Sequence, residues 1–345
     1  MASVVRNEEF RRLTAAGLRI LAVAAAWLVA GRIGLLQQVV VGGAKVAPLW
    51  PPTGIALTCL LILGLRVWPG IAIGTLLVIA TIGPVNGASV AIAAGNSLAV
   101  VCSCLMLRRV GFRIELDRLR DGVALVFLGA LAGMLISATV GSLALMLVGS
   151  LPASGFCATW SAWWAGDAMG VLVITPLLLA AYTFRRPAAI RPHQWIEPPL
   201  LVMVTTAVAL AGTRSTLHLL FLVFPLLMWA ALRYQLTAAA PCVLAVSVVA
   251  VRAAVDDVGP FAGHSTLAVM FTLQALNGAA ALTALLLSAL IAEQRNTYSR
   301  IEQACVALAE VVARLAPGED AHRRPPAEDA HRRPPAEDED HPGGR

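Results

Sequence analysis

Charged residues are scarce in this sequence: they make up 13% of its 345 residues, while hydrophobic residues make up 58%. An ordinary soluble domain is about half apolar and about a quarter charged, so this composition excludes a soluble globular protein. Recognisable catalytic patterns are missing as well. The sequence has no glycine-rich phosphate loop, no HExxH zinc pattern, no nucleophile elbow and no paired carboxylates within an apolar stretch. We therefore predict that the chain is not an enzyme.

Clusters of metal-binding residues are also absent from the sequence. Its six cysteines are scattered, and the closest pair, Cys102 and Cys104, points to opposite sides of a helix with no histidine nearby. We predict no metal site and no cofactor, and interpret the cysteines as small packing residues. The net charge of +6 comes from arginines at the ends of apolar segments. It indicates contact with membrane lipid rather than with nucleic acid.

Long apolar runs fill most of the chain. A helix needs roughly 20 apolar residues to cross the hydrocarbon core of a membrane, and hydropathy predicts an all-α, polytopic transmembrane bundle of about eight to ten spans. The segments 54–66 and 198–212 are short, and either is a candidate half of a re-entrant pair; without one pair, eight spans remain. The ten segments are 14–36, 54–66, 68–82, 87–107, 122–148, 160–182, 198–212, 217–232, 236–254 and 266–292.

The basic residues orient these segments. If the N-terminus is cytoplasmic, sixteen arginines fall in inward-facing segments and only four basic residues fall outside, at Arg32, Lys45, Arg214 and Arg252. Cytoplasmic loops carry an excess of Lys and Arg. We therefore predict a membrane protein with both termini in the cytoplasm.

The sequence divides into four predicted parts: a cytoplasmic segment 1–13, a membrane domain 14–292, a cytoplasmic helix 293–316 and a disordered tail 317–345. The tail repeats the nonapeptide EDAHRRPPA, which cannot support a core. The helix keeps a heptad pattern that includes Ile301, Leu308 and Leu315, typical of a short coiled coil, although a solvated, fraying helix fits the pattern nearly as well.

Two constellations carry the candidate binding residues. The first is an outer loop with Trp50, Pro51, Pro52 and Thr53, which fits either the lip of a recognition pocket or an interfacial anchor at a helix start. The second lies within the predicted spans and comprises Asn96, Trp163, Trp164 and Asp167.

Asp167 is the only carboxylate well inside a predicted span, and such groups are expensive in a membrane and indicate function by default. Its expected partner is Arg32, Lys45, Arg214 or Asn96, while a packing role remains an alternative. Gly166 and Gly170 are four residues apart, which allows another helix to come close. Gln274 shares a helix face with Asn277 in the last span, where both are expected to make contacts between helices.

Seven motifs occur in the order known from one family of membrane domains. They are 50–57 (WPPTGIAL), 63–70 (LGLRVWPG), 95–98 (GNSL), 163–170 (WWAGDAMG), 175–178 (TPLL), 224–233 (FPLLMWAALR) and 282–285 (LTAL). Over about 10–295 the chain resembles the first-described type of bacterial membrane-associated sensor domain, the MASE group. Two positions depart from the family pattern: Ala99 stands where the family tends to carry Glu, and Ile79 where it often has Asn.

This resemblance implies about eight spans and a sensory role upstream of histidine kinase, diguanylate cyclase, PAS or phosphatase modules. No such module follows in 317–345, so we expect the output to lie on a separate partner, a kinase, cyclase or phosphatase, with the domain acting alone or as a homodimer. A stimulus bound around Trp50, Asn96 and Asp167 would shift the last span. Gln274, Ile301, Leu308 and Leu315 would relay that shift. A small permease, a transporter-associated subunit or an inert sensor remnant are the alternatives.

Overall fold

The computed structural model describes residues 2–184, 193–215 and 219–315. Within them the protein is all-α apart from one small hairpin, which confirms the predicted fold class. The chain divides into two units, Met1–Arg295 and Asn296–Arg345, and helix α11 (Thr266–Leu315) contains the boundary between them. The predicted tail 317–345 lies outside the described residues.

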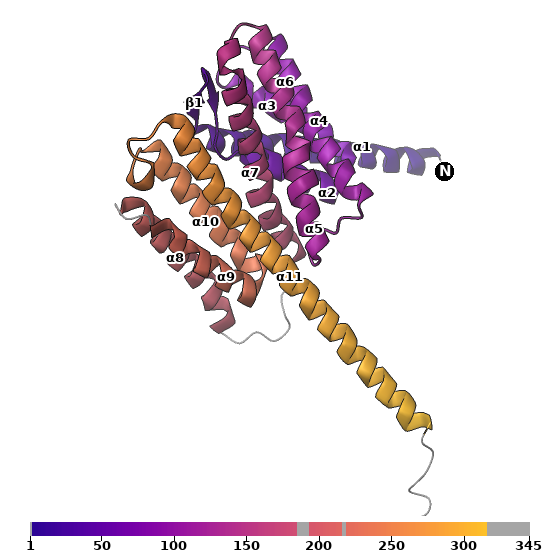
Figure 1. The fold of residues 1–345 in the computed structure, drawn as a ribbon. Coiled ribbons are helices and arrows are strands. Elements are labelled where there is room, and N and C mark those ends of the chain that lie inside the picture. Colours follow the sequence, from indigo (N-terminus) through magenta and orange to yellow (C-terminus); the bar gives the residue numbers. More distant parts are fainter. Residues whose placement is uncertain (1, 185–192, 216–218, 316–345) are drawn as a thin grey trace, which may run out of the picture. The chain divides into compact units, whose positions relative to one another are not determined.

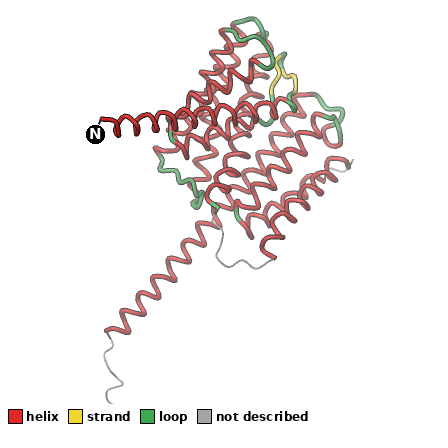
Figure 2. The backbone as a smooth tube through the Cα atoms, turned by 180° about the vertical axis from the view of Figure 1, so that it is seen from behind, coloured by secondary structure: helices red, strands yellow, loops and turns green. Residues whose placement is uncertain are grey.

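The first unit is built from apolar helices that run back and forth (Figures 1 and 2). Within the described residues, seven helical stretches are long and apolar enough to cross a membrane, so the chain is a multi-pass membrane protein. Three helical stretches are shorter: Pro51–Leu63, Leu65–Ala80 and Leu219–Tyr234. The main helices are α1 (Ala2–Leu35), α2 (Pro51–Leu63), α3 (Trp68–Ala80), α4 (Gly87–Arg109), α5 (Leu119–Ala124), α6 (Gly133–Leu147), α7 (Phe156–Thr183), α8 (His193–Arg214), α9 (Val223–Tyr234), α10 (Leu236–Val255) and α11.

Of the two segments that the sequence predicts to be short, one is short in the structure and the other is not. The predicted segment 54–66 is indeed short, since α2 has 13 residues, or about 20 Å at 1.5 Å per residue. The segment 198–212 is longer than predicted, because α8 begins before Pro198 and Pro199 and continues through them. Each proline removes one hydrogen bond within the helix, to the carbonyls of residues 194 and 195, and its ring crowds the preceding turn. The consecutive short helices are instead α2 and α3.

Small residues let the helices approach closely. A Cβ atom on Gly74 of α3 would lie 2.6 Å from the Cβ of Trp27 on α1, and one on Gly95 of α4 would lie 2.8 Å from the Cβ of Val140 on α6. Membrane helices associate through such close packing rather than through hydrophobic burial. These glycines therefore fix the α1–α3 and α4–α6 crossings that surround the site described below.

Residues 125–132 between α5 and α6 form a π-helical segment, η2 (Leu125–Ala132). Its wider turns free backbone carbonyls, and two of them find side-chain donors. The Ser103 hydroxyl donates to the Gly129 carbonyl at 3.1 Å, and the Trp164 indole N–H donates to the Leu131 carbonyl at 2.8 Å. π-Helical segments of this kind are frequent at functional sites.

Hydrogen bonds identify two opposite ends of the first unit. At one end, the Gln274 side chain on α11 contacts Pro48. At the other end, the Glu293 carboxylate accepts a bond from the Leu119 amide at 2.9 Å, and Arg295 donates to the Leu232 carbonyl at 3.1 Å. The second end is the one to which the sequence assigns the cytoplasmic arginines.

A two-stranded antiparallel hairpin, β1 (Val39–Val41) and β2 (Ala44–Val46), follows α1. Its turn consists of Gly42 and Gly43, both with positive φ, a backbone conformation that favours glycine. The Thr159 hydroxyl of α7 donates to the Val41 carbonyl at 2.9 Å. The hairpin is thereby attached to the helix that carries Asp167.

Candidate functional site

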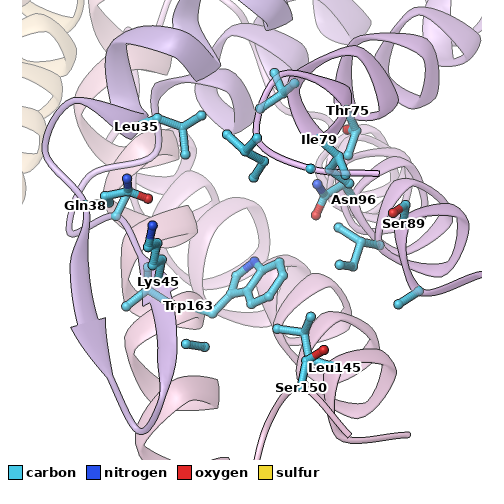
Figure 3. A pocket seen from close by; sticks show the side chains of 18 of the residues that line it. Leu35, Gln38, Lys45, Thr75, Ile79, Ser89, Asn96, Leu145, Ser150 and Trp163 are labelled. Carbon is cyan, nitrogen blue, oxygen red and sulfur yellow. The ribbon is translucent and has the colours of Figure 1, made fainter. Parts of the chain in front are cut away.

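A cavity of about 500 Å³ lies among α1, the hairpin, α3, α4, α6 and α7. This volume is in the range of small-molecule sites. Most of its wall is apolar, and a few polar side chains reach it from different elements. In Figure 3, Gln38 and Lys45 lie on the hairpin side, Thr75, Ser89 and Asn96 lie on the other side, and Trp163 lies between the two groups.

Four of the predicted binding residues line this one cavity: Trp50, Asn96, Trp163 and Asp167. The other four, Pro51, Pro52, Thr53 and Trp164, do not belong to its lining. The structure therefore brings together residues from both predicted constellations, and the most distant of them in the sequence, Trp50 and Asp167, are more than a hundred positions apart. Ligand binding by these residues stays a prediction.

The remaining members of the two constellations hold the cavity wall in place. Pro51 and Pro52 occupy the first positions of α2, where a missing N–H costs nothing. The Thr53 hydroxyl lies within hydrogen-bonding distance of two carbonyls, that of Trp50 at 2.8 Å and that of Asp167 at 3.1 Å. Trp164 binds the π-helical segment and stacks on Trp160, with ring centroids 6.0 Å apart.

Gly166 and Gly170 of α7 are in close contact with the segment around Trp50 and the start of α2, and their four-residue spacing predicts such a close approach. The Gly166 carbonyl accepts a hydrogen bond from the Trp50 amide at 3.0 Å. A Cβ on Gly170 would lie only 1.9 Å from the Trp50 carbonyl oxygen, and a Cβ on Gly54 would lie 2.2 Å from the Gly170 carbonyl oxygen. Only glycine leaves room for this contact. It holds Trp50 beside Asp167.

The Asp167 side chain is fully buried, with 1% of its surface exposed. The Ser137 hydroxyl of α6 donates a hydrogen bond to its carboxyl group, and Trp163 is a second hydrogen-bonding neighbour. The sequence prediction of Arg32, Lys45, Arg214 or Asn96 as the bonded partner is therefore wrong. Lys45 and Asn96 line the same cavity, while Arg32 and Arg214 do not. A hydroxyl on the adjacent helix satisfies the carboxyl without the cost of burying a second charge.

Three buried polar atoms of the cavity residues have no hydrogen-bond partner among the described residues. They are the indole nitrogen of Trp27, the hydroxyl of Thr75 and the side-chain oxygen of Asn96, and each residue is at least nine-tenths buried. A buried polar atom without a partner costs about 1–3 kcal/mol. All three atoms belong to residues that line the cavity, on α1, α3 and α4.

The sequence did not indicate four further polar or aromatic residues that line the cavity: Trp27, Gln38, Thr75 and Ser89. Trp27 and Thr75 stand alone in apolar segments, and Gln38 and Ser89 lie near helix ends, where polar residues are common. Neither spacing nor composition therefore distinguishes them from packing or capping residues. Ile79, one of the two departures from the family pattern, lines the cavity and makes this part of its wall apolar (Figure 3). The other departure, Ala99, is buried in the core and does not line it.

The predicted relay residues fall in two environments. The Gln274 side chain donates to the Pro48 carbonyl at 2.9 Å, which links α11 to the segment that carries Trp50. Asn277 differs from the prediction, because both of its amide atoms are buried without a partner among the described residues. Ile301 and Leu308 are exposed, and the Leu315 side chain lies outside the described residues. The described residues contain no group of three or more His, Cys, Asp or Glu side chains that could hold a metal ion.

The comparisons with known proteins give one result for the chain as a whole. The family model MASE1 matches residues 19–295, which contain every residue that lines the cavity. No curated protein and no solved structure matches the chain. The matched region ends at Arg295, the residue at which the first compact unit ends.

Proposed function

The chain belongs to the MASE1 family, membrane-associated sensory domains of signalling proteins, and we propose that it detects a small molecule in the cavity and reports it through α11. MASE1 domains are sensory and not catalytic, and in our proposal this chain has no enzymatic activity of its own. The proposed recipient of the signal is a cytoplasmic kinase, cyclase or phosphatase.

The observation that carries this proposal is the hydrogen bond between Gln274 and the Pro48 carbonyl. Pro48 is two residues from Trp50, which lines the cavity, and Gln274 is on α11. This helix has 50 residues and continues past the end of the matched region. A change in the cavity wall at Trp50 thus acts directly on the helix that leaves the domain.

A ligand shifts this system only by binding one arrangement of the wall better than another. A preference of about tenfold corresponds to about 1.4 kcal/mol. That is comparable to the net value of one hydrogen bond such as that between Gln274 and Pro48. Making or breaking this bond is therefore a sufficient response to ligand occupancy.

A second connection supports the proposal from the opposite end of the domain. Ser137, which binds Asp167, is on α6, and α6 follows η2 and α5 in one helical stretch, Leu119–Leu147. The first amide of that stretch, Leu119, binds Glu293 on α11. If ligand binding at Asp167 shifts this stretch, the shift would therefore also move α11 at Glu293, near the end of the first unit.

The proposed location is the bacterial plasma membrane, with both termini in the cytoplasm. This orientation is supported by the sixteen arginines in inward-facing segments and by the position of Glu293 and Arg295 at the arginine-rich end of the bundle. We further propose that α2 and α3 form the short re-entrant pair, which leaves eight spans. Arg66 lies at the turn between these two helices, so fifteen of the sixteen arginines remain in cytoplasmic segments. The exposed Ile301 and Leu308 are the proposed contacts for a second copy of the chain or for the output partner.

The test replaces the chromosomal gene in the native host with three variants of the full chain. Ile92→Trp fills the cavity from α4, Leu98→Trp adds the same bulk to an exposed position of the same helix, and the third variant lacks 296–345. We expect Ile92→Trp to change the cellular phosphorylation or cyclic-dinucleotide response, and Leu98→Trp to leave it unchanged. We expect the truncation to lose both the response and the recovery of a partner from membranes.

The permease alternative predicts a different pattern. A permease needs its cavity but not its C-terminal helix, so Ile92→Trp would abolish uptake of a solute while the variant without 296–345 would retain it. Retained uptake together with an unchanged signalling response in the truncated variant would contradict the sensor proposal.

A further inference from the structure

The charges and unpartnered atoms on the cavity wall specify the chemical class of the ligand. This inference rests on the proposed function, because it concerns the same cavity. Asp167 and Lys45 are the only Asp, Glu, Lys or Arg residues among its lining residues. They come from different elements, α7 and β2, and no ion pair joins them or involves Lys45 among the described residues. One acidic and one basic side chain thus remain available to the same occupant.

The acidic part of the wall offers hydrogen-bond acceptors. Among the described residues, the buried Asp167 side chain has the Ser137 hydroxyl and Trp163 as its hydrogen-bonding neighbours, and the Asn96 side-chain oxygen has no partner. Acceptors of this kind bind N–H donors, and a buried carboxylate is best satisfied by a positive charge. Trp50 and Trp163 line the same space and supply aromatic surface, which also favours a cation. This part of the wall therefore suits an ammonium or a quaternary amine.

The basic part of the wall offers donors. Lys45 is an exposed residue of the hairpin that lines the cavity, and the Trp27 indole N–H is buried without a partner among the described residues. Both groups donate hydrogen bonds and neither accepts one. A ligand with only a positive charge would leave the indole N–H unpaired and would meet Lys45 as a like charge. A carboxylate or another anionic group on the same ligand removes both costs.

We propose that the cavity binds a small zwitterion, with its amine or ammonium group at Asp167 and Asn96 and its anionic group at Lys45 and Trp27. A roughly spherical space of 500 Å³ is about 10 Å across. An amino acid or a betaine fits within this length, and its apolar part would contact Val78, Ile79 and Leu145 on the wall. The ligand enters from the hairpin side, which the arginine distribution places outside the cell.

The test measures binding to the purified full chain in lipid nanodiscs by calorimetry and by the shift in thermal unfolding. The zwitterionic probes are glycine betaine, γ-aminobutyrate, leucine and phenylalanine; choline is the cationic probe and butyrate the anionic one. We expect at least one zwitterion to bind and to raise the unfolding temperature, with choline and butyrate each about tenfold weaker or more. Absence of binding by all four zwitterions, or equal binding of choline or butyrate, would overturn the proposal.

Three variants assign the ends of the ligand. Asp167→Asn keeps a hydrogen-bonding side chain and removes the charge, and Lys45→Gln changes an exposed residue. We expect each to weaken zwitterion binding about tenfold or more. Lys45→Gln should also improve the binding of choline relative to that of the zwitterion. Arg32→Gln is the matched control, since Arg32 is an exposed cation that does not line the cavity, and it should leave affinity unchanged.

These results separate the ligand class from the sensory role. If choline or butyrate binds instead of a zwitterion and Ile92→Trp prevents this binding, the ligand class is wrong while the cavity remains the stimulus site. If a zwitterion binds as described but Ile92→Trp changes no cellular response, the ligand class stands and the sensory function of the cavity is wrong. Unchanged zwitterion affinity in both Asp167→Asn and Lys45→Gln refutes the assignment of the two ends.

Discussion

Gly170 is the position at which a single methyl group should be most damaging. Its Cβ would lie 1.9 Å from the Trp50 carbonyl oxygen and 2.5 Å from the Thr53 hydroxyl, and the first of these atoms belongs to the backbone. An ordinary contact distance is about 3.5 Å. The start of α2 and helix α7 would therefore have to separate by more than 1 Å.

The energetic cost of Gly170→Ala follows from what this separation breaks. The hydrogen bonds from the Trp50 amide to the Gly166 carbonyl, at 3.0 Å, and from the Thr53 hydroxyl to the Asp167 carbonyl, at 3.1 Å, both join the separating segments. Each contributes about 1 kcal/mol, and overpacking of a tight contact costs about 1–3 kcal/mol. We expect Gly170→Ala to lower the free energy of unfolding by about 3–5 kcal/mol.

The assay is thermal and denaturant unfolding of the full chain in nanodiscs, with Gly278→Ala as the matched control. The nearest atom to a Cβ at Gly278 of α11 is the Met169 Cε at 3.8 Å, which is an ordinary contact. Alanine is favoured over glycine inside a helix by about 1 kcal/mol, so Gly278→Ala should be neutral or stabilising. A Gly170→Ala variant within about 1 kcal/mol of wild type would refute the close packing of the loop on α7.

Three further predictions address the topology and two buried polar groups. Single cysteines at positions 19, 113 and 300 should be labelled from the cytoplasm and one at position 45 from outside, and an outside signal at 113 would overturn the orientation. Asp167→Asn should keep its bond with Ser137 and the stability of the wild type, whereas Asp167→Leu should lose about 1–3 kcal/mol because the Ser137 hydroxyl loses its acceptor. If Asp167→Leu has the same unfolding temperature and the same cellular response as the wild type, Asp167 has no role in the site. Asn277→Leu should raise the free energy of unfolding by about 1–3 kcal/mol, because its amide is buried without a partner.

The sequence could predict the elements and the close approach at Gly166 and Gly170, because apolar length and small-residue spacing are local signals. It could also have predicted the hairpin, since Gly42 and Gly43 between valine-rich segments form a recognised turn signal. It could not predict Ser137 as the partner of Asp167. That contact joins two helices, and its register follows a π-helical segment that shifts all following side chains around the helix axis.

The cavity shows the same division between local and long-range information. Asp167 and Asn96 stand out in a sequence because polar residues are rare in membrane spans. Thr75 and Trp27 do not, since a lone hydroxyl or indole in an apolar helix is common. Their importance depends on what faces them across the cavity, and this is fixed by the α1–α3 crossing at Gly74 rather than by their own segments.

The buried amide of Asn277 lowers the stability of the fold, and variants at this position test whether it serves a change in the arrangement of α11. The residue has no exposed surface and both amide atoms are without a partner among the described residues, while Gln274, one turn away on α11, has a partner in Pro48. An unpaired amide weakens the arrangement seen here, and its presence is explained if it gains a partner in a second arrangement of α11. Asn277→Leu should then stabilise the fold and also reduce the cellular response to a stimulus, because it favours the present arrangement. Gln274→Leu is the contrasting variant, and it should lower stability because it leaves the Pro48 carbonyl without its donor. An Asn277→Leu variant that is more stable but responds as the wild type does would show that α11 signals without a second arrangement of this amide.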